Sequence, residues 1–210
     1  MGEAVKIISF QNAKPAQCMA ALKTLVSLED YLAQEFHAKT RHEYIHEEII
    51  PMLYTSRKHG RIASNIFGAL CVCSANKDYF VYAADRMLSV ALTDGTHNLY
   101  YPDLMVVEGE EQCRRLSENM EATINPVLLV EILSGSNADS DLIDKMTHYK
   151  TIPSLKQYLI VWQNEIRVEL YTRTSGANQW LNTVFTRSEE VCQLLDCEIT
   201  LAQTYNKTAL

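Results

Sequence analysis

The chain has 210 residues, of which 47% are hydrophobic and 21% are charged, and its formal net charge is −7. This composition is typical of one soluble globular domain with a substantial core. The acidic balance argues against a protein that coats nucleic acid through a basic surface. No stretch approaches the roughly 20 apolar residues of a membrane span, and the first residues lack the basic start and apolar core of a signal peptide. We therefore expect a cytoplasmic protein with no membrane partner.

The six cysteines show no metal-binding spacing, because none forms a Cys-x-x-Cys pair or has a histidine at zinc-finger distance. We expect all six to be reduced, buried thiols.

The N-terminal half is predicted to contain an extension, a helix, a strand and a second helix. Residues 1–26 are assigned to an N-terminal extension and residues 27–210 to a single domain. Ser27 followed by Asp30 resembles a capping box that opens a helix. Residues 42–52 have the apolar content of a strand, and Ser56 is positioned to cap a helix with an apolar stripe.

A positive cluster follows Ser56 in the sequence: Arg57, Lys58, His59 and Arg61. It is the best candidate for a local patch that steers an anionic substrate. A solvated surface turn is an equally good interpretation.

The middle of the chain predicts a hairpin and a buried strand. Residues 79–92 and 99–107 flank a turn signal at Asp94-Gly95, which favours an antiparallel hairpin. Residues 108–125 are acidic and polar, so we expect an exposed loop with some helix. Residues 126–133 form the near-continuous apolar run of a strand covered on both faces.

The C-terminal third predicts a helix, a strand, a hairpin and a short terminal segment. The helix follows a Ser/Asn/Asp-rich start, and Pro153 stops it. Its apolar side is formed by Leu142, Ile143, Met146 and Tyr149. The strand covers residues 155–162, and residues 166–173 and 179–186 alternate as a second hairpin. The whole order indicates an α/β, mixed α+β protein with one mixed sheet and helices packed on it.

Two carboxylates interrupt apolar strands, Asp103 in "YYPDLMVV" and Glu131 in "LLVEIL". A lone ionised carboxylate is costly in apolar surroundings, so each needs a partner, a metal or a neutral state. If the two strands are neighbours, the carboxylates can converge on one side of the sheet. Such a pair suits Mg²⁺, with the backbone carbonyl of Ile132 as a further ligand.

Lys145 lies 14 residues after Glu131, on the next helix. It is the best candidate to stabilise negative charge on a phosphate that is attacked by water. From the spacing alone, an exposed ion pair between Asp141 and Lys145 is the more ordinary interpretation.

These pieces together resemble the PD-(D/E)XK restriction-endonuclease-like superfamily and, more narrowly, the Uma-type endonucleases that are abundant in cyanobacteria. The resemblance covers about residues 27–205. It is carried by the stretches at 27–52 and 56–66, by "VYAAD" and "YYPDLMVV", and by the block from "LLVEILSGS" to "LKQYLIV". It implies a restriction-endonuclease-like fold, with a central mixed β-sheet flanked by helices and additional β-hairpins.

The family pattern implies roles for the matching residues. Asp103 matches the acid of the PD motif, and Glu131 matches the acid of (D/E)XK. The usual lysine position holds Leu133, and Lys145 on the following helix is implied to replace that lysine. The implied metal ligands are Asp103, Glu131 and the carbonyl of Ile132.

Further positions match the family less specifically. Glu48 matches an early acid and is implied to be an auxiliary ligand or a hydrogen-bond acceptor, although an exposed carboxylate at a sheet edge explains it equally well. His59 and Tyr149 match family positions, and ordinary packing explains both. Trp162 departs from the family, because many relatives carry an aspartate there.

The resemblance implies a Mg²⁺- or Mn²⁺-dependent endonuclease that acts on nucleic acid, with DNA favoured. It also favours a homodimer, because many nucleases of this superfamily pair to address two strands. Two alternatives remain open. One is a non-catalytic dimeric scaffold or nucleic-acid-associated protein with the same fold, which the acidic net charge favours slightly. The other is a hydrolase of different phosphate esters.

Overall fold

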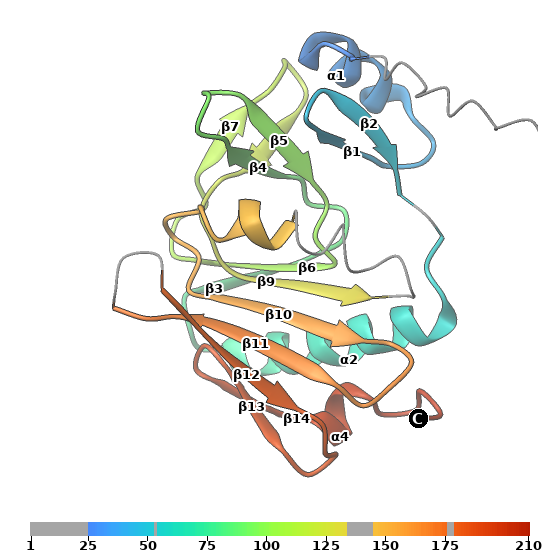
Figure 1. Cartoon of the computed structure of the whole chain (residues 1–210), viewed down its shortest axis with the longest axis vertical. Coiled ribbons are helices and arrows are strands. Elements are labelled where there is room, and N and C mark those ends of the chain that lie inside the picture. Colours follow the sequence, from blue (N-terminus) through green and yellow to red (C-terminus); the bar gives the residue numbers. More distant parts are fainter. Residues whose placement is uncertain (1–24, 53, 134–144, 176–178) are drawn as a thin grey trace, which may run out of the picture.

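The computed structural model describes residues 25–52, 54–133, 145–175 and 179–210. They form two six-stranded sheets and one two-stranded sheet, with few helices (Figure 1). We call the first six-stranded sheet, in the order β2-β1-β5-β4-β8-β7, sheet A, and the second, β12-β11-β10-β9-β6-β3, sheet B. No helix in this part of the chain is long and apolar enough to cross a membrane. Most of the predicted N-terminal extension lies outside the described residues.

Sheet B is the mixed sheet that the sequence predicted. Its strands are β3 (Tyr79–Ala83), β6 (Leu104–Glu108), β9 (Pro126–Leu133), β10 (Gln157–Trp162), β11 (Val168–Arg173) and β12 (Trp180–Phe185). β9 and β10 are parallel, and the other neighbours are antiparallel. Both β9 and β10 are buried along nearly their whole length, which explains their continuous apolar sequences.

Sheet A was not anticipated as a separate sheet. Its strands are β1 (His42–Ile45), β2 (Glu48–Pro51), β4 (Leu88–Ala91), β5 (His97–Tyr100), β7 (Cys113–Arg115) and β8 (Glu121–Thr123). The single strand predicted over 42–52 is a hairpin, because His46 and Glu47 adopt positive φ angles of 50° and 63° and reverse the chain. Residues 108–125, expected as a loop with some helix, contain β7 and β8. These strands are too short to show an alternating pattern.

The hairpin predicted around Asp94-Gly95 is present as β4 and β5, but each of its arms divides between the two sheets. One arm leaves sheet B after β3 and enters sheet A at β4. The other leaves sheet A after β5 and enters sheet B at β6. Asp103 lies at this second crossing, directly before β6. Pro102 has no N–H group to donate to a strand neighbour, which suits a break in the ladder.

The described helices are α1 (Leu28–His37), α2 (Arg57–Ser74), α4 (Leu201–Thr204) and a helical segment at 145–149. Both predicted N-caps are present, since the N–H groups of Asp30 and His59 donate to the hydroxyls of Ser27 and Ser56, each at 3.1 Å. α2 packs on one face of sheet B, and the segment at 145–149 packs on the opposite face. The earlier part of that predicted helix, with Leu142 and Ile143, lies outside the described residues.

The C-terminal region adds a hairpin and a disulfide. β13 (Val191–Leu194) and β14 (Cys197–Thr200) pair with each other, and β14 packs on α2. Cys73 of α2 is bonded to Cys197 of β14, so the prediction of six reduced, buried thiols is wrong for this pair. The two cysteines are 124 residues apart in sequence, and only the packing of β14 on α2 brings them together. The prediction is also wrong for Cys113, whose free thiol belongs to an exposed residue.

Candidate active site

Asp103 and Glu131 occupy neighbouring strands of sheet B. β6 pairs antiparallel with β9, with Leu104 opposite Val130. One further step of this register sets Asp103 opposite Glu131. Residues directly opposite each other project from the same face of a sheet, so the strands meet the condition for the two carboxylates to converge.

Two donors fix the orientation of Asp103 through a single oxygen. The backbone N–H of Ile132 donates to Oδ2 at 2.7 Å, and Nε2 of the buried His59 lies 3.1 Å from the same atom. The first turn of α2 holds His59 in place, because Ser56 caps that turn and also donates to the side chain of Gln163. Within the described part of the chain, all hydrogen bonds of this carboxylate go to Oδ2, so Oδ1 keeps its lone pairs for a ligand.

Glu131 is buried and is likewise held through one oxygen. The hydroxyl of Tyr149 donates to Oε1 at 2.9 Å, and Nζ of Lys145 lies 3.6 Å from that atom. Burial raises the pKa of Glu131 to about 8. The positive charge of Lys145 opposes this rise, whereas the negative charges of Asp103 and Glu43 add to it. These surroundings therefore favour the neutral form of Glu131 near neutral pH, and a further cation beside it would favour the ionised form.

Lys145 bridges the two sheets. Its Nζ lies 2.9 Å from Oε1 of Glu43 in β1 of sheet A, closer than to Glu131 in β9 of sheet B. Glu43 is buried and also accepts a hydrogen bond from the N–H of Tyr101 at 3.2 Å. The Lys145 side chain is only 11% exposed. Lys145 is therefore buried, whereas the interpretation from spacing required it to be exposed. Asp141 lies outside the described residues.

Sequence reasoning selected Glu48 and missed Glu43. In the β1–β2 hairpin, Glu43 is opposite Ile50 and Ile45 is opposite Glu48, so both acids project from the same face. Glu43 lies on the inner strand, next to β5, whereas Glu48 begins the half-exposed edge strand β2. A signal was available, because Glu43 stands next to the apolar pair Tyr44 and Ile45, as Asp103 and Glu131 stand beside apolar residues.

The donor chemistry of this cluster fits a divalent cation. Oδ1 of Asp103 and Oε2 of Glu131 make no hydrogen bond to any described residue, and the backbone of Ile132 lies beside them. No three His, Cys, Asp or Glu side chains form a ready-made metal cluster in the described ranges. A cation held by these two carboxylates and the Ile132 carbonyl would therefore need water ligands, which Mg²⁺ commonly retains.

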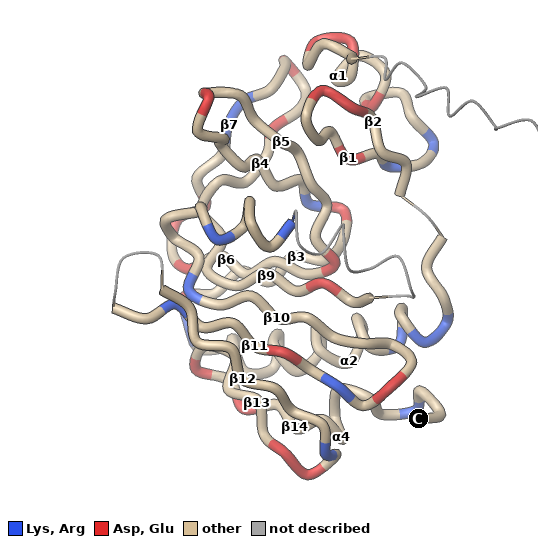
Figure 2. Tube along the Cα trace, viewed as in Figure 1, with Lys and Arg blue, Asp and Glu red and all other residues tan. Residues whose placement is uncertain are grey.

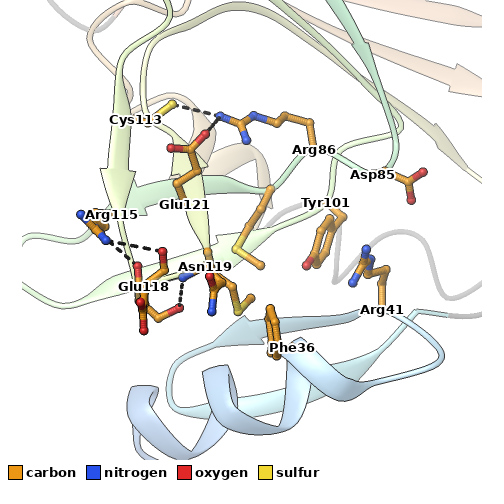
Figure 3. A pocket seen from close by; sticks show the side chains of 13 residues that line it. Phe36, Arg41, Asp85, Arg86, Tyr101, Cys113, Arg115, Glu118, Asn119 and Glu121 are labelled. Carbon is orange, nitrogen blue, oxygen red and sulfur yellow. Dashed lines mark hydrogen bonds and ion pairs between the residues drawn. The ribbon is translucent and has the colours of Figure 1, made fainter.

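A pocket of about 700 Å³ is lined in part by Tyr101, whose backbone N–H donates to Glu43 (Figure 3). Three arginines and three acids line it, so its formal charges balance: Arg41, Arg86, Arg115, Asp85, Glu118 and Glu121. The guanidinium of Arg86 is already engaged by Glu111, Glu121 and the thiol of Cys113. We assign no chemistry to this pocket.

The chain is similar to known proteins along most of its length. The family model Uma2, described as "Putative restriction endonuclease", matches residues 28–203. The uncharacterized protein sll1609 of Synechocystis sp. PCC 6803 is 33% identical over 166 residues, which cover 79% of this chain and 90% of that protein. Another protein of this organism, slr1290, is 26% identical over 156 residues, which cover 74% and 78%.

A solved structure shows the same fold. It is the crystal structure of "a putative nuclease belonging to DUF820" from Anabaena variabilis, which matches with a TM-score of 0.67. The match covers 86% of this chain and 97% of that chain at 17% sequence identity. The predicted fold class, a mixed α+β protein of the restriction-endonuclease-like fold, is confirmed.

Proposed function

Because this chain belongs to the Uma2 family, as its motifs predicted, we propose that it is a Mg²⁺- or Mn²⁺-dependent endonuclease that hydrolyses nucleic-acid phosphodiester bonds, with DNA as the favoured substrate. The family and the nuclease fold support a nuclease. The proposed active site consists of Asp103, Glu131 and Lys145, with Glu43 as the anchor of the lysine. Glu48 stays a prediction as an auxiliary acid.

One observation carries the proposal: three carboxylates gather around one buried ammonium group. Glu43 and Glu131 contact Lys145, and Asp103 lies close enough to Glu131 to raise its pKa. Buried charges that are not fully paired cost folding free energy. Functional sites often contain such destabilising groups, because the chemistry requires charged side chains in a buried setting.

The residues of the chain divide the work. Asp103, Glu131 and the Ile132 carbonyl would hold the cation, which when bound makes water a better nucleophile and offsets charge on the phosphate. His59 and Tyr149 keep the two carboxylates in fixed orientations, so their remaining oxygens stay aligned.

Lys145 supplies positive charge where negative charge develops on the phosphate. Glu43 holds this ammonium group from the other sheet. The attacking group is water, so we expect no covalent intermediate. A homodimer remains part of the proposal, by analogy with other nucleases of the superfamily.

Plasmid cleavage tests the proposal. Asp103→Asn keeps the size of the side chain and removes its charge, and we expect a loss of about 100-fold or more in Mg²⁺- or Mn²⁺-dependent cleavage. The matched control is Asp85→Asn, which makes the same change at an exposed acid outside the cluster. Calorimetric titration of Mn²⁺ into wild type and Glu131→Gln tests the ligands directly. Equal Mn²⁺ binding by both proteins would overturn the site assignment.

The net charge of −7 favours a second candidate, a non-catalytic dimeric scaffold or nucleic-acid-associated protein. Wild-type protein that neither binds Mn²⁺ nor cleaves nucleic acid would support it. Cleavage confined to small phosphodiesters would instead indicate a different phosphate-ester hydrolase.

A further inference from the structure

We call Glu43, Asp103 and Glu131, together with Lys145, the acidic cluster. Beyond it, sheet B carries a row of aromatic rings on the face that α2 does not cover. The rings belong to Trp162 in β10, Tyr171 in β11 and Trp180 in β12. All three pack with the core on the side of the segment at 145–149, which includes Tyr149 and Tyr158, rather than with α2. In Figure 1, α2 lies behind this sheet and the opposite face is turned to the viewer. We call the surface formed by these three rings the aromatic face.

The aromatic face is continuous with the acidic cluster. Ile160 is opposite Glu131 on one side and opposite Glu169 on the other, and Tyr171 lies two residues beyond Glu169. With strands about 4.8 Å apart and a rise of about 3.3 Å per residue, the Cα atoms of Glu131 and Tyr171 are about 12 Å apart. Ring contacts link the two sites, from Tyr149 to Tyr158 at 5.4 Å and from Tyr158 to Tyr171 at 6.3 Å.

Each ring of the aromatic face is covered by a cation, but two of these cations are already engaged. The guanidinium of Arg167 lies 4.5 Å from the Trp162 ring and pairs with Glu169 at 2.6 Å. The guanidinium of Arg173 lies 4.4 Å from the Trp180 ring, and its N–H groups donate to three backbone carbonyls at 2.7–3.0 Å. These arginines therefore hold the surface together.

Lys150 is different. Its Nζ lies 4.4 Å from the centre of the Tyr171 ring and 5.9 Å from that of Trp180. Within the described ranges it makes no ion pair and no hydrogen bond through that atom. Burial lowers the pKa of this ammonium group. The aromatic face thus presents a positive charge that no carboxylate of the described chain neutralises.

Lys150 and Trp180 also line a pocket of about 360 Å³ with Met146 and Thr147. The indole N–H of Trp180 is buried and donates to no described residue. Past this pocket the sheet opens to solvent, where Val184 is 47% exposed. A ligand with flat rings and negative charge matches these features.

We propose that the aromatic face binds an unpaired strand of nucleic acid that leads into the acidic cluster. Bases stack on aromatic rings and on guanidinium planes, such as those of Arg167 and Arg173 over the two tryptophans, largely without sequence preference. Phosphates pair with cations such as Lys150. A duplex offers few free ring faces, because its bases already stack on each other. The inference rests on the proposed nuclease function and makes its substrate a single strand or a frayed end.

Binding measured without divalent metal tests this inference separately from cleavage. Fluorescence anisotropy in EDTA compares labelled single-stranded DNA, single-stranded RNA and duplex DNA of one sequence. We expect wild type to prefer single strands, and Lys150→Met to bind them about tenfold more weakly. The control Lys39→Met removes the same charge from an exposed site outside the aromatic face and is expected to bind normally.

A second pair of variants separates stacking from packing. Trp180→Phe keeps an aromatic ring and is expected to retain single-strand binding, whereas Trp180→Leu is expected to lose about tenfold in affinity. Weaker binding of both single-stranded DNA and single-stranded RNA by Lys150→Met and Trp180→Leu supports the inference. The single strand that wild type binds more tightly identifies DNA or RNA as the ligand. Tighter binding of duplex, unchanged binding by Lys150→Met and Trp180→Leu, or no binding by wild type overturns it. Failure of the nuclease proposal has a different readout, because it would appear as the absence of metal-dependent plasmid cleavage by wild type.

Discussion

At the scale of single residues, Lys145 combines a structural and a chemical role. Its ammonium group is the only cation in contact with both Glu43 and Glu131 within the described chain. Removing one partner of a buried charge pair leaves the other charge uncompensated, and this costs more than the pair itself contributes. A loss of activity in a simple Lys145 variant would therefore not distinguish catalysis from folding.

A double variant separates the two roles. We expect Lys145→Met to destabilise the protein by about 3 kcal/mol, because Glu43 and Glu131 lose their buried counter-ion. Adding Glu43→Gln removes one unpaired charge and is expected to restore much of that stability, but no cleavage. Urea denaturation and plasmid cleavage measure the two effects. Cleavage restored together with stability would contradict the catalytic role of Lys145.

At the scale of elements, Glu111 ties sheet A to sheet B. Its carboxylate accepts hydrogen bonds from Tyr82 in β3 at 2.7 Å, from Arg86 between β3 and β4 at 2.8 Å, and from Thr123 in β8. Burial acts to raise the pKa of Glu111, but the hydrogen bonds from Thr123, Tyr82 and Arg86 and the charge of Arg86 outweigh it and lower the pKa. The ionised form is therefore favoured by folding.

This shift predicts a pH dependence with a definite sign. A carboxyl group whose pKa is lower in the folded state stabilises the protein above its unfolded pKa of about 4.5, and this stabilisation is lost as the pH falls through the folded pKa. Glu111→Gln is expected to cost about 2 kcal/mol at neutral pH, and the gap to wild type is expected to shrink in acid. Thermal unfolding across pH measures the gap. A stability difference between wild type and Glu111→Gln that does not change with pH would contradict this prediction. So would an equal stability difference for the exposed control Glu118→Gln.

Local sequence signals predicted the elements that depend on neighbouring residues. The caps at Ser27 and Ser56, the buried runs of β9 and β10 and the hairpin turn at Asp94-Gly95 follow from such signals. The β1–β2 turn was missed because His46 and Glu47 are not the glycine or asparagine that positive φ usually selects. The second sheet was missed because each arm of the predicted hairpin changes partners midway, and no local pattern records that.

The residues of the site divide in the same way, into those that local sequence signals predicted and those that only long-range packing brings together. Asp103 and Glu131 stood out because each is an acid in an apolar strand, and their pairing followed from adjacent strands. Glu43 contacts Lys145 across a separation of 102 residues, so only the packing of the two sheets reveals it. The Cys73–Cys197 disulfide is long-range in the same way.

At the scale of the whole molecule, a net charge of −7 must be reconciled with a polyanionic substrate. Acidic and basic residues are interspersed along the chain, and basic residues occur at the start of α2 (Figure 2). Arg57 and Arg61 are exposed there, on either side of the buried His59 that contacts Asp103. The basic cluster that the sequence suggested therefore has two parts. The imidazole of His59 points inward to Asp103, whereas Arg57 and Arg61 are exposed cations.

Salt dependence tests whether these cations guide the substrate. Each phosphate contact that is lost reduces the slope of log affinity against log salt by about 0.9 for duplex DNA or 0.7 for single strands. Arg57→Gln/Arg61→Gln is therefore expected to weaken binding at low salt and to make the slope shallower by about 1.5. Lys39→Gln/Lys207→Gln removes the same charge from exposed positions elsewhere and, since long-range effects are screened beyond about 10 Å at moderate salt, is expected to keep the wild-type slope. Equal slopes for all three proteins would mean that the basic turn of α2 is an ordinary solvated surface, and that the substrate is held by the aromatic face and the acidic cluster alone.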